Sequence, residues 1–364
     1  MTDFDFLVEK ADLLRTRWLA SPAVRPPPNG VVVELERFAL TANNLTYAKL
    51  GDALGYWRYF PAPQGFGRMP VWGVACIVES ANAELAEGER VYGFLPVSTR
   101  CALTPAPRAA FGFVDAAPHR ADLPSAYNEY RLIDRDSNWD RNDENAFLAL
   151  RPLFILGFFL AEWLAEEKWF GCERVVVSSA SSKAATALGR QIGARVETIG
   201  LTSERNRSTV AKMGIFDRAI AYSAVADEVS LAERPAIFVD IAGDAGLEAS
   251  LERRMGAALV RTVAVGATRG DPARFRMAPE GEGGQRADVF FAPAHIPRLK
   301  DAWGPATLRD RLAQSWASYL ATVQERLTFE SCAGRTAIAR ACERVAQGAA
   351  PADLVTILTA PGLE

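Results

Sequence analysis

The sequence has few of the residues that usually bind metals. Only two of its 364 residues are histidines, His119 and His295, and its five cysteines are scattered along the chain. Neither histidine has a cysteine or a second histidine at the spacing of a zinc site, and both lie near prolines, as surface and loop histidines often do. We therefore expect no bound metal. An odd number of scattered cysteines shows no disulfide framework and is typical of a reducing cytoplasm.

The sequence also lacks a strong charge imbalance, an export signal and a long apolar run. A net charge of −3 gives no electrostatic reason to expect nucleic acid as a partner. The N-terminus, MTDFDFLVEKADLLRTRW, has no basic start followed by an apolar segment, so we expect no export. The most apolar run, PLFILGFFLAEWLAE (residues 152–166), is too short to span a bilayer. These observations predict a cytoplasmic protein that binds neither nucleic acid nor membranes.

Glycine is missing from the one turn where it would be expected. In VVVSSASSKAATALG (residues 175–189) an apolar, β-branched run ends in small residues, and a helical pattern follows. This strand, turn and helix are typical of dinucleotide-binding proteins, which normally carry Gly-x-Gly-x-x-Gly in the turn. Here the turn is built from serine and alanine. Either it binds phosphate without glycine, or it has become a purely structural turn.

The order of the expected elements divides the chain into two parts. Up to about residue 145 the sequence is rich in short strands, which suggests a small barrel or sandwich; we expect them at residues 31–40, 71–80, 89–96 and 128–134. From about residue 147, near-continuous apolar strands alternate with amphipathic helices, which predicts a parallel sheet covered on both faces. The fold class is therefore α/β. Two helices are expected nearer the C-terminus, at residues 307–326 and 334–348.

Taken in order, four segments resemble the medium-chain dehydrogenase/reductase superfamily, especially its zinc-free quinone- and enoyl-reductase-like branch. They are residues 74–94 (VACIVESANAELAEGERVYGF), 128–134 (NEYRLID), 193–222 (GARVETIGLTSERNRSTVAKMGIFDRAIAY) and 237–243 (IFVDIAG). The C-terminal stretch with DVFFAPAHI is more similar to DUF2855, a family for which the resemblance implies no known substrate. Where zinc-dependent members show Gly-His-Glu, this sequence has RMPVWGVAC, and no four-cysteine lobe is present.

The resemblance implies an architecture. A GroES-like barrel domain would comprise residues 1–145 with 293–364, completed by the C-terminal helices. A Rossmann domain of the doubly wound, parallel type would comprise residues 146–292. A homodimer is implied by the resemblance alone.

The serine turn retains features that suit a pyrophosphate. Phosphate binding uses free N–H groups and the positive end of a helix dipole, neither of which requires glycine. All side chains from 178 to 182 are small, Ser181 or Ser182 is a good N-cap, and Lys183 adds positive charge at the helix start. Against this, the loop is about three residues shorter than in the proteins it resembles. The alternative is a structural turn with a solvated lysine.

The next turn, GLTSERNR (residues 200–207), suggests a preference between the two nicotinamide dinucleotides. NAD-binding folds place an acid here, on the ribose 2′-hydroxyl. A serine and an arginine instead suit the 2′-phosphate of NADPH; the resemblance assigns this role to Ser203 and Arg207, and matches Tyr222 to a tyrosine of the same pocket. The alternative is an exposed helix start capped by Ser203.

Candidates for proton transfer and substrate orientation lie in NNLTYAKLGDALGYW (residues 43–57). The resemblance suggests a tyrosine acid near Tyr56, with Tyr47 as the second candidate, and Asn43 to orient the substrate. The alternative is that these tyrosines simply pack beneath the barrel. The aromatic segment 55–72 is expected to line an apolar substrate pocket, or else to be a core or dimer-facing loop.

Together these features predict a zinc-free, NADPH-dependent reductase of an activated double bond or carbonyl, such as a quinone, an enone or an enoyl thioester. Its substrate would be a small apolar or acyl molecule. The alternative is a non-catalytic relative whose altered turn no longer holds a dinucleotide, and which binds an apolar or acyl ligand or a protein partner.

Overall fold

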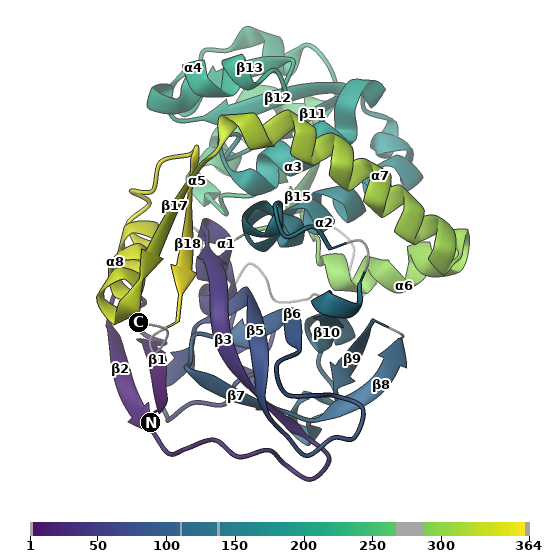
Figure 1. Ribbon diagram of the computed structural model, residues 1–364. Helices are drawn as coiled ribbons and strands as arrows, with labels where there is room; N and C mark the ends of the chain where they lie inside the picture. The colour runs from purple at the N-terminus through teal and green to yellow at the C-terminus, as the bar shows by residue number, and fades with distance from the viewer. Residues whose placement is uncertain (1–2, 110, 137–138, 267–286, 361–364) are drawn as a thin grey trace. The chain divides into compact units, whose positions relative to one another are not determined.

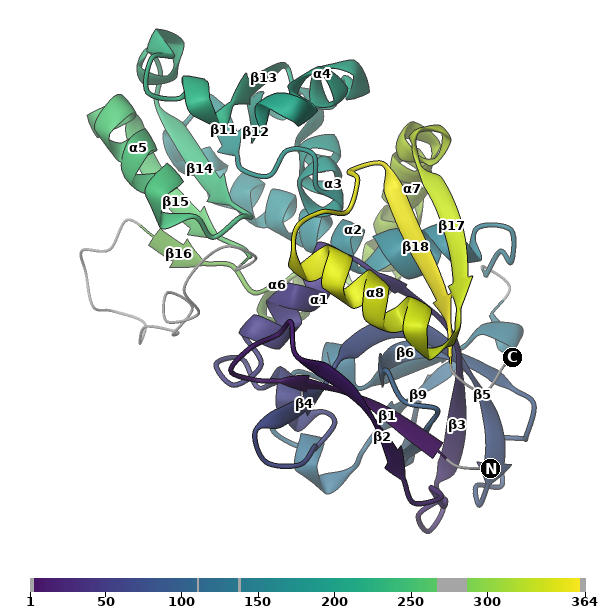
Figure 2. The same ribbon diagram turned by 90° about the vertical axis from the view of Figure 1, so that its left-hand side faces the viewer.

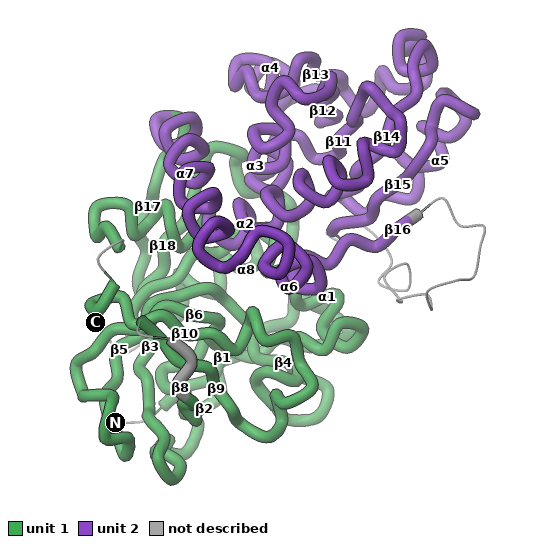
Figure 3. Tube along the Cα trace, turned by 90° about the vertical axis from the view of Figure 1, so that its right-hand side faces the viewer, with its two compact units in different colours: residues 1–150, 326–364 green, residues 151–325 purple. Residues whose placement is uncertain are grey.

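The computed structural model describes residues 3–109, 111–136, 139–266 and 287–360. The chain divides into two compact units, one formed by residues 1–150 with 326–364 and the other by residues 151–325 (Figure 3). Both units combine sheet and helix, so the predicted α/β class is confirmed. Each unit is described separately below.

The first unit is built on a nine-stranded sheet. The strand order is β17-β18-β3-β5-β6-β10-β9-β8, and β7 also pairs with β3. The four predicted strands are all present, as β3, β5, β6 and β10. The bounds are β3 (Val31–Leu40), β5 (Pro70–Ser80), β6 (Arg90–Pro96), β7 (Arg100–Leu103), β8 (Pro105–Ala109), β9 (Gly112–Asp115), β10 (Glu129–Leu132), β17 (Thr328–Ala333) and β18 (Leu354–Thr359). A three-stranded sheet, ordered β2-β1-β4, belongs to the same unit, with β1 (Asp3–Glu9), β2 (Thr16–Ser21) and β4 (Phe66–Arg68).

The C-terminal part of the chain adds strands as well as a helix to this unit. β18 pairs antiparallel with β3 and parallel with β17, so the end of the chain lies beside an early strand (Figure 1). Sequence analysis expected only helices here. The sequence of β17, TFESCA, lacks a clean apolar alternation because this edge strand is half-exposed along its length. Helix α8 (Gly334–Ala346), shown beside these strands in Figure 2, places Ile338, Ala341 and Cys342 in the core of the unit.

The second unit contains a six-stranded, fully parallel sheet with the order β13-β12-β11-β14-β15-β16. This is the 3-2-1-4-5-6 order of the doubly wound dinucleotide-binding fold, as predicted. The strands are β11 (Arg174–Val177), β12 (Glu197–Thr202), β13 (Arg218–Ala221), β14 (Ala236–Asp240), β15 (Leu259–Ala264) and β16 (Ala287–Val289). The connecting helices include α3 (Lys183–Ile192), α4 (Glu204–Met213) and α5 (Ala245–Met255). Since both faces of β11 and β14 are buried, their sequences, RVVV and AIFVD, are nearly continuous apolar runs.

Helices α2 (Glu144–Glu166), α6 (Ala292–Trp303) and α7 (Pro305–Val323) complete the second unit, although the start of α2 belongs to the first. The predicted boundary at residue 293 is therefore wrong. Residues 293–325, which include most of α6 and all of α7, cluster with the parallel sheet. The physical reason is packing. The Phe154 ring of α2 lies 5.3 Å from that of Trp316 in α7, and Arg190 of α3 donates a hydrogen bond of 2.6 Å to Ser318.

Helix α2 is longer than the apolar run that predicted it. Its 23 residues are enough, by length and composition, to cross a membrane, so the expectation that the segment is too short is wrong. However, 61% of its most apolar window is buried inside the protein. At Gly157 an added Cβ would lie 2.7 Å from the backbone nitrogen of Leu188 in α3. Close packing therefore explains the apolar composition of this helix.

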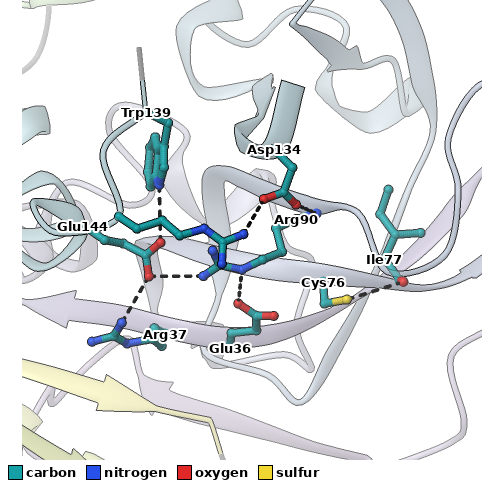
Figure 4. Close-up of polar contacts among 9 residues, drawn as sticks. Glu36, Arg37, Cys76, Ile77, Arg90, Asp134, Trp139 and Glu144 are labelled. Carbon is teal, nitrogen blue, oxygen red and sulfur yellow. Dashed lines mark hydrogen bonds and ion pairs between the residues drawn. The ribbon is translucent and has the colours of Figure 1, made fainter. Parts of the chain in front are cut away.

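A buried carboxylate fixes the start of α2 on the first unit (Figure 4). Glu144 is 3% exposed and accepts hydrogen bonds of 3.1 Å from Arg37 and of 3.1 Å from Arg90. The Arg90 Nε also donates to Glu36 at 2.8 Å. Because acidic residues are favoured in the first turn of a helix, Glu144 is well placed there, and its two contacts with arginine anchor the start of α2.

Candidate cofactor and catalytic sites

The serine turn lies at the carboxyl edge of the parallel sheet, between β11 and α3. Strands β11 and β14 are parallel neighbours there. Successive strands are added on one side of the sheet from β11 to β13 and on the other side from β14 to β16, and doubly wound folds bind their ligands at this switch point. Ser182 is the N-cap of α3, because its Oγ accepts a hydrogen bond of 3.2 Å from the Ala185 N–H. Of the two predicted caps, the structure uses Ser182 and not Ser181.

Ser179 has an unusual backbone conformation for a residue with a side chain. Its φ of 52° lies in the left-handed region, which glycine adopts at little cost. Its N–H donates a hydrogen bond of 2.8 Å to the hydroxyl of Tyr222, the residue that follows β13. The structure therefore brings two predicted site elements, the serine turn and Tyr222, into direct contact.

Other N–H groups of the turn also have partners within the protein. The Ala180 N–H donates to the Leu201 carbonyl at 2.9 Å, and the Ser182 N–H donates to the Ser179 carbonyl at 2.7 Å. These hydrogen bonds thus fix the conformation of the turn. As a result, a phosphate would depend more on the first turn of α3 and on Lys183 than on the N–H groups of the loop.

The Ser181 side chain faces the adjacent turn. Its Oγ accepts hydrogen bonds of 3.1 Å from Asn206 Nδ2 and of 3.5 Å from Thr202 Oγ1. Ser181 therefore ties the β11–α3 turn to the start of α4. Asn206 was not among the predicted site residues, since an asparagine within a helical pattern carries no signal of its own.

Sequence analysis also missed a buried pair that joins β11 to β14. Ser178 and Asp240 are fully buried, and the Ser178 hydroxyl donates to Asp240 Oδ1 at 2.9 Å. The same hydroxyl accepts from the N–H groups of Ile241 at 2.8 Å and Ala242 at 3.0 Å, and Gly243 N–H donates to Asp240 Oδ1 at 2.9 Å. These contacts fix the turn after β14. The signal in the sequence was an acid that ends an otherwise apolar strand.

Ser203 and Arg207, the predicted 2′-phosphate ligands, lie at the start of α4. Ser203 occupies the N-cap position without making a cap bond, and its Oγ is buried with no hydrogen-bond partner in the described part of the protein. Arg207 forms an ion pair of 2.9 Å with Glu204, and both side chains are more than half exposed. An unsatisfied buried hydroxyl beside an exchangeable arginine fits an incoming phosphate group.

The predicted tyrosines meet in the first unit. The rings of Tyr47 and Tyr56 lie 4.8 Å apart, and the Tyr56 hydroxyl forms a hydrogen bond of 3.1 Å with that of Tyr127. Trp72 Nε1 donates to the Tyr47 hydroxyl at 3.1 Å. Tyr127 was not predicted, because it lies 71 residues from Tyr56 in sequence and only the fold brings the two together.

Burial keeps these phenols protonated. Desolvation raises the pKa of Tyr47 to about 12, although hydrogen bonds from Trp72, Asn43 and Tyr127 oppose the shift. Desolvation also raises the pKa of Tyr56 and that of Tyr127 well above the usual value. At neutral pH the group can therefore donate protons in hydrogen bonds but cannot act as a base.

Asn43 and the aromatic segment 55–72 have different surroundings. Asn43 is half-buried in the first turn of α1 (Ala42–Lys49), on the same helix face as Tyr47. In the aromatic segment the side chains that could line a pocket are instead buried in the unit, with Trp57 6% exposed and Tyr59 1% exposed. The alternative of a core segment is therefore the one that the packing favours.

Cysteine and metal chemistry have little support among the described residues. No group of three or more His, Cys, Asp or Glu side chains that could hold a metal ion occurs in the ranges given above. Cys76 donates a weak hydrogen bond to the Ile77 carbonyl (Figure 4), and burial followed by the nearby Glu36 and Glu34 raises the pKa of its thiol. A raised pKa makes this thiol a poor nucleophile.

Known structures share this fold across the whole chain. CurA from Vibrio vulnificus, solved in complex with NADPH, has a TM-score of 0.61 and 12% identity, with 98% of each chain covered. A putative NADPH:quinone reductase from Mesorhizobium loti has a TM-score of 0.57 and 14% identity, again with 98% of each chain covered. A quinone oxidoreductase from Pseudomonas syringae has a TM-score of 0.55 and 15% identity, with 98% of this chain and 100% of the other covered. No curated protein matches the sequence.

These similarities establish the medium-chain reductase fold, a GroES-like barrel unit with a Rossmann unit, which the sequence had suggested. The family model described as "Protein of unknown function (DUF2855)" matches residues 38–351. The chain therefore belongs to the DUF2855 family and has the fold of the medium-chain dehydrogenases and reductases.

Proposed function

We propose that the protein is a zinc-free, NADPH-dependent reductase of an activated double bond or carbonyl, such as a quinone, an enone or an enoyl thioester. One observation carries the proposal: the Ser178–Ser182 turn, Tyr222, Ser203 and Arg207 gather at the carboxyl edge of a sheet with dinucleotide-binding strand order. The NADPH in the CurA structure, which shares this fold, supports the choice of cofactor.

Two turns would bind different parts of the dinucleotide. The first turn of α3, with Lys183, would hold the pyrophosphate through the helix dipole and the lysine charge. Ser203 and Arg207 would hold the 2′-phosphate, since Ser203 Oγ lacks a partner among the described residues and Arg207 can exchange Glu204 for a phosphate. When bound, NADPH supplies a hydride.

The protein's own part in the chemistry would be to place the substrate and to supply a proton. Tyr56 and Tyr47 are protonated at neutral pH, and Tyr127 contacts Tyr56 through its hydroxyl. Either candidate would hold a proton at its hydroxyl, and Asn43 would orient the substrate. The proposal includes a small apolar or acyl substrate, a homodimer, as the resemblance implies, and a cytoplasmic location, as the scattered cysteines suggest.

Direct binding measurements test this function first. Purified protein is mixed with NADPH, nicotinamide fluorescence is recorded, and calorimetry gives the dissociation constants for NADPH and NADH. We expect binding of NADPH and weaker binding of NADH. Turnover is then screened with quinones, enones and enoyl thioesters by the loss of NADPH absorbance.

A second candidate function follows from the hydrogen bonds within the serine turn. Because the N–H groups of Ser179, Ala180 and Ser182 already have partners, the turn offers fewer donors than a glycine-rich one. A non-catalytic relative would use the same fold to bind an apolar or acyl ligand or a protein partner. No binding of either nucleotide at millimolar concentration would contradict the reductase and favour this second function.

A further inference from the structure

We propose that Tyr222 is a positioning residue whose hydroxyl holds Ser179 in the left-handed conformation, so that the serine turn keeps its shape without glycine. The inference rests on the proposed function for its ligand, the pyrophosphate of a dinucleotide. It assigns Tyr222 a different role from the 2′-phosphate contact that the sequence suggested.

Ser179 is the strained residue of the turn. Its φ of 52° is one that side-chain-bearing residues rarely adopt, because Cβ crowds the carbonyl oxygen that follows it. The residues on both sides are anchored, since Ser178 N–H donates to Val239 at 3.0 Å and Ala180 N–H donates to Leu201 at 2.9 Å. The chain therefore has to reverse at Ser179 itself, and a local contact is needed to offset the strain.

The hydrogen bond to Tyr222 provides this contact. The Ser179 N–H points at the Tyr222 hydroxyl at 2.8 Å, which is a good hydrogen-bond length, and the contact is partly buried. Ser179 lies beyond the last paired residue of β11, so the phenol supplies the hydrogen-bond partner of its N–H in the described part of the protein. The hydrogen bond is comparable in free energy to the backbone strain that it offsets.

The sheet explains why a tyrosine reaches the turn. Ala221 ends β13 and pairs with Thr202 of β12. The backbone of Tyr222 therefore lies at the carboxyl edge of the parallel sheet, and β12 separates β13 from β11. Its long side chain spans that distance. On β12, Gly200 leaves room for the turn, because an added Cβ would lie 2.7 Å from the Cβ of Ala180. Tyr222 thus supports the tight reversal that a glycine usually provides, and Gly200 allows the turn to pack closely on the sheet.

A double-mutant cycle tests the inference. Tyr222→Phe removes only the hydroxyl, and Ser179→Gly removes the strain that the hydroxyl offsets. Each single variant, the double variant and the wild type are compared by thermal unfolding without ligand and by calorimetric titration with NADPH. Tyr222→Phe should lower the unfolding midpoint and weaken NADPH binding by up to about tenfold. In the Ser179→Gly background the same substitution should cause clearly smaller losses, because the backbone strain is gone and only the lost hydrogen bond to the N–H of residue 179 remains.

Tyr319→Phe is the matched control. Tyr319 is also buried in the second unit, and its hydroxyl donates to the Lys183 carbonyl at 3.4 Å without contacting Ser179. Ser179→Gly should therefore not rescue the effects of Tyr319→Phe. A rescue of both tyrosine variants would show only a general gain of stability and would overturn the inference.

Two other results would also overturn it. Equal losses from Tyr222→Phe in both backgrounds would show that the hydroxyl does not act through Ser179. If Tyr222→Phe weakened the binding of NADPH but not of NADH, and Ser179→Gly did not rescue it, Tyr222 would instead contact the 2′-phosphate, as the sequence suggested. If the wild type binds no dinucleotide, the proposed function fails, but the ligand-free unfolding cycle still decides whether Tyr222 holds the turn.

Discussion

Replacing Arg207 with alanine separates recognition of the 2′-phosphate from recognition of the rest of the dinucleotide. Arg207 forms an ion pair with Glu204 at 2.9 Å, and the two side chains are 53% and 63% exposed. An exposed pair of this kind contributes about 0.3–0.5 kcal/mol, so the substitution should leave the unfolding midpoint almost unchanged. The effect should therefore appear in binding alone.

The size of the binding effect follows from the exposure of the site. A charge-assisted hydrogen bond contributes roughly 1.5–3 kcal/mol, and solvent screening together with competition from Glu204 favours the lower end. A loss of about 1.4 kcal/mol is tenfold in the dissociation constant. NADPH should bind about tenfold more weakly to Arg207→Ala, while NADH, which has no 2′-phosphate, should bind as it does to the wild type.

Calorimetry with both nucleotides on the wild type and the variant measures this difference. Arg205→Ala is the control, since it removes the same charge two residues away, where helical side chains do not share a face. If Arg205→Ala weakens NADPH as much as Arg207→Ala does, the effect is general electrostatics. If Arg207→Ala weakens NADPH and NADH equally, the residue does not contact the 2′-phosphate and the reasoning is refuted.

Four further outcomes are expected. Lys183→Glu puts a negative charge at the start of α3 and should weaken NADPH and NADH alike by at least about tenfold in calorimetry; an unchanged affinity would remove Lys183 from the phosphate site. If Tyr56 supplies the proton, Tyr56→Phe should lower kcat by about 10²–10⁴-fold with little change in NADPH affinity, and unchanged turnover would transfer the role to Tyr47 or to water. Because the pKa of Tyr47 is raised to about 12, the folded state keeps a proton that the unfolded chain releases above about pH 10, so the stabilising effect is complete below that pH and is lost as the pH rises. Denaturant unfolding should show stability falling by at least about 1.4 kcal/mol per pH unit toward pH 12, since the pKa values of Tyr56 and Tyr127 are raised too, and a flat profile would contradict the burial of these phenols. Elemental analysis should find no stoichiometric zinc, and chelator should not change activity or the unfolding midpoint; one zinc per chain would contradict the zinc-free assignment.

Local patterns in the sequence were sufficient for much of the fold. In residues 31–40 the apolar side chains are buried and the charged ones, Glu34, Glu36 and Arg37, are partly exposed, while RVVV is continuous because β11 is buried on both faces. The serine turn was located from the strand before it and the helix after it, and the N-cap was narrowed to two serines. Such features depend on residues within a few positions of one another, so periodicity and capping chemistry reveal them.

Other elements gave no such local signal. The edge strand β17 is half-exposed and lacks alternation, and α7 joins the second unit through rings and hydroxyls on α2 and α3 that lie far away in sequence. An amphipathic helix shows that it has a partner but not which one it has. The boundary between the two units was therefore decided by tertiary packing.

The candidate sites show the same division. The sequence determined that serines, a lysine, an arginine and tyrosines would stand at the ends of certain strands and helices. Only the tertiary structure decided that Ser179 turns its N–H to Tyr222, 43 residues away, and that Ser178 meets Asp240 across 62 residues. The physical reason is that hydrogen bonds require distances near 3 Å and fixed directions, and these arise when the parallel sheet brings the carboxyl ends of distant strands to one edge.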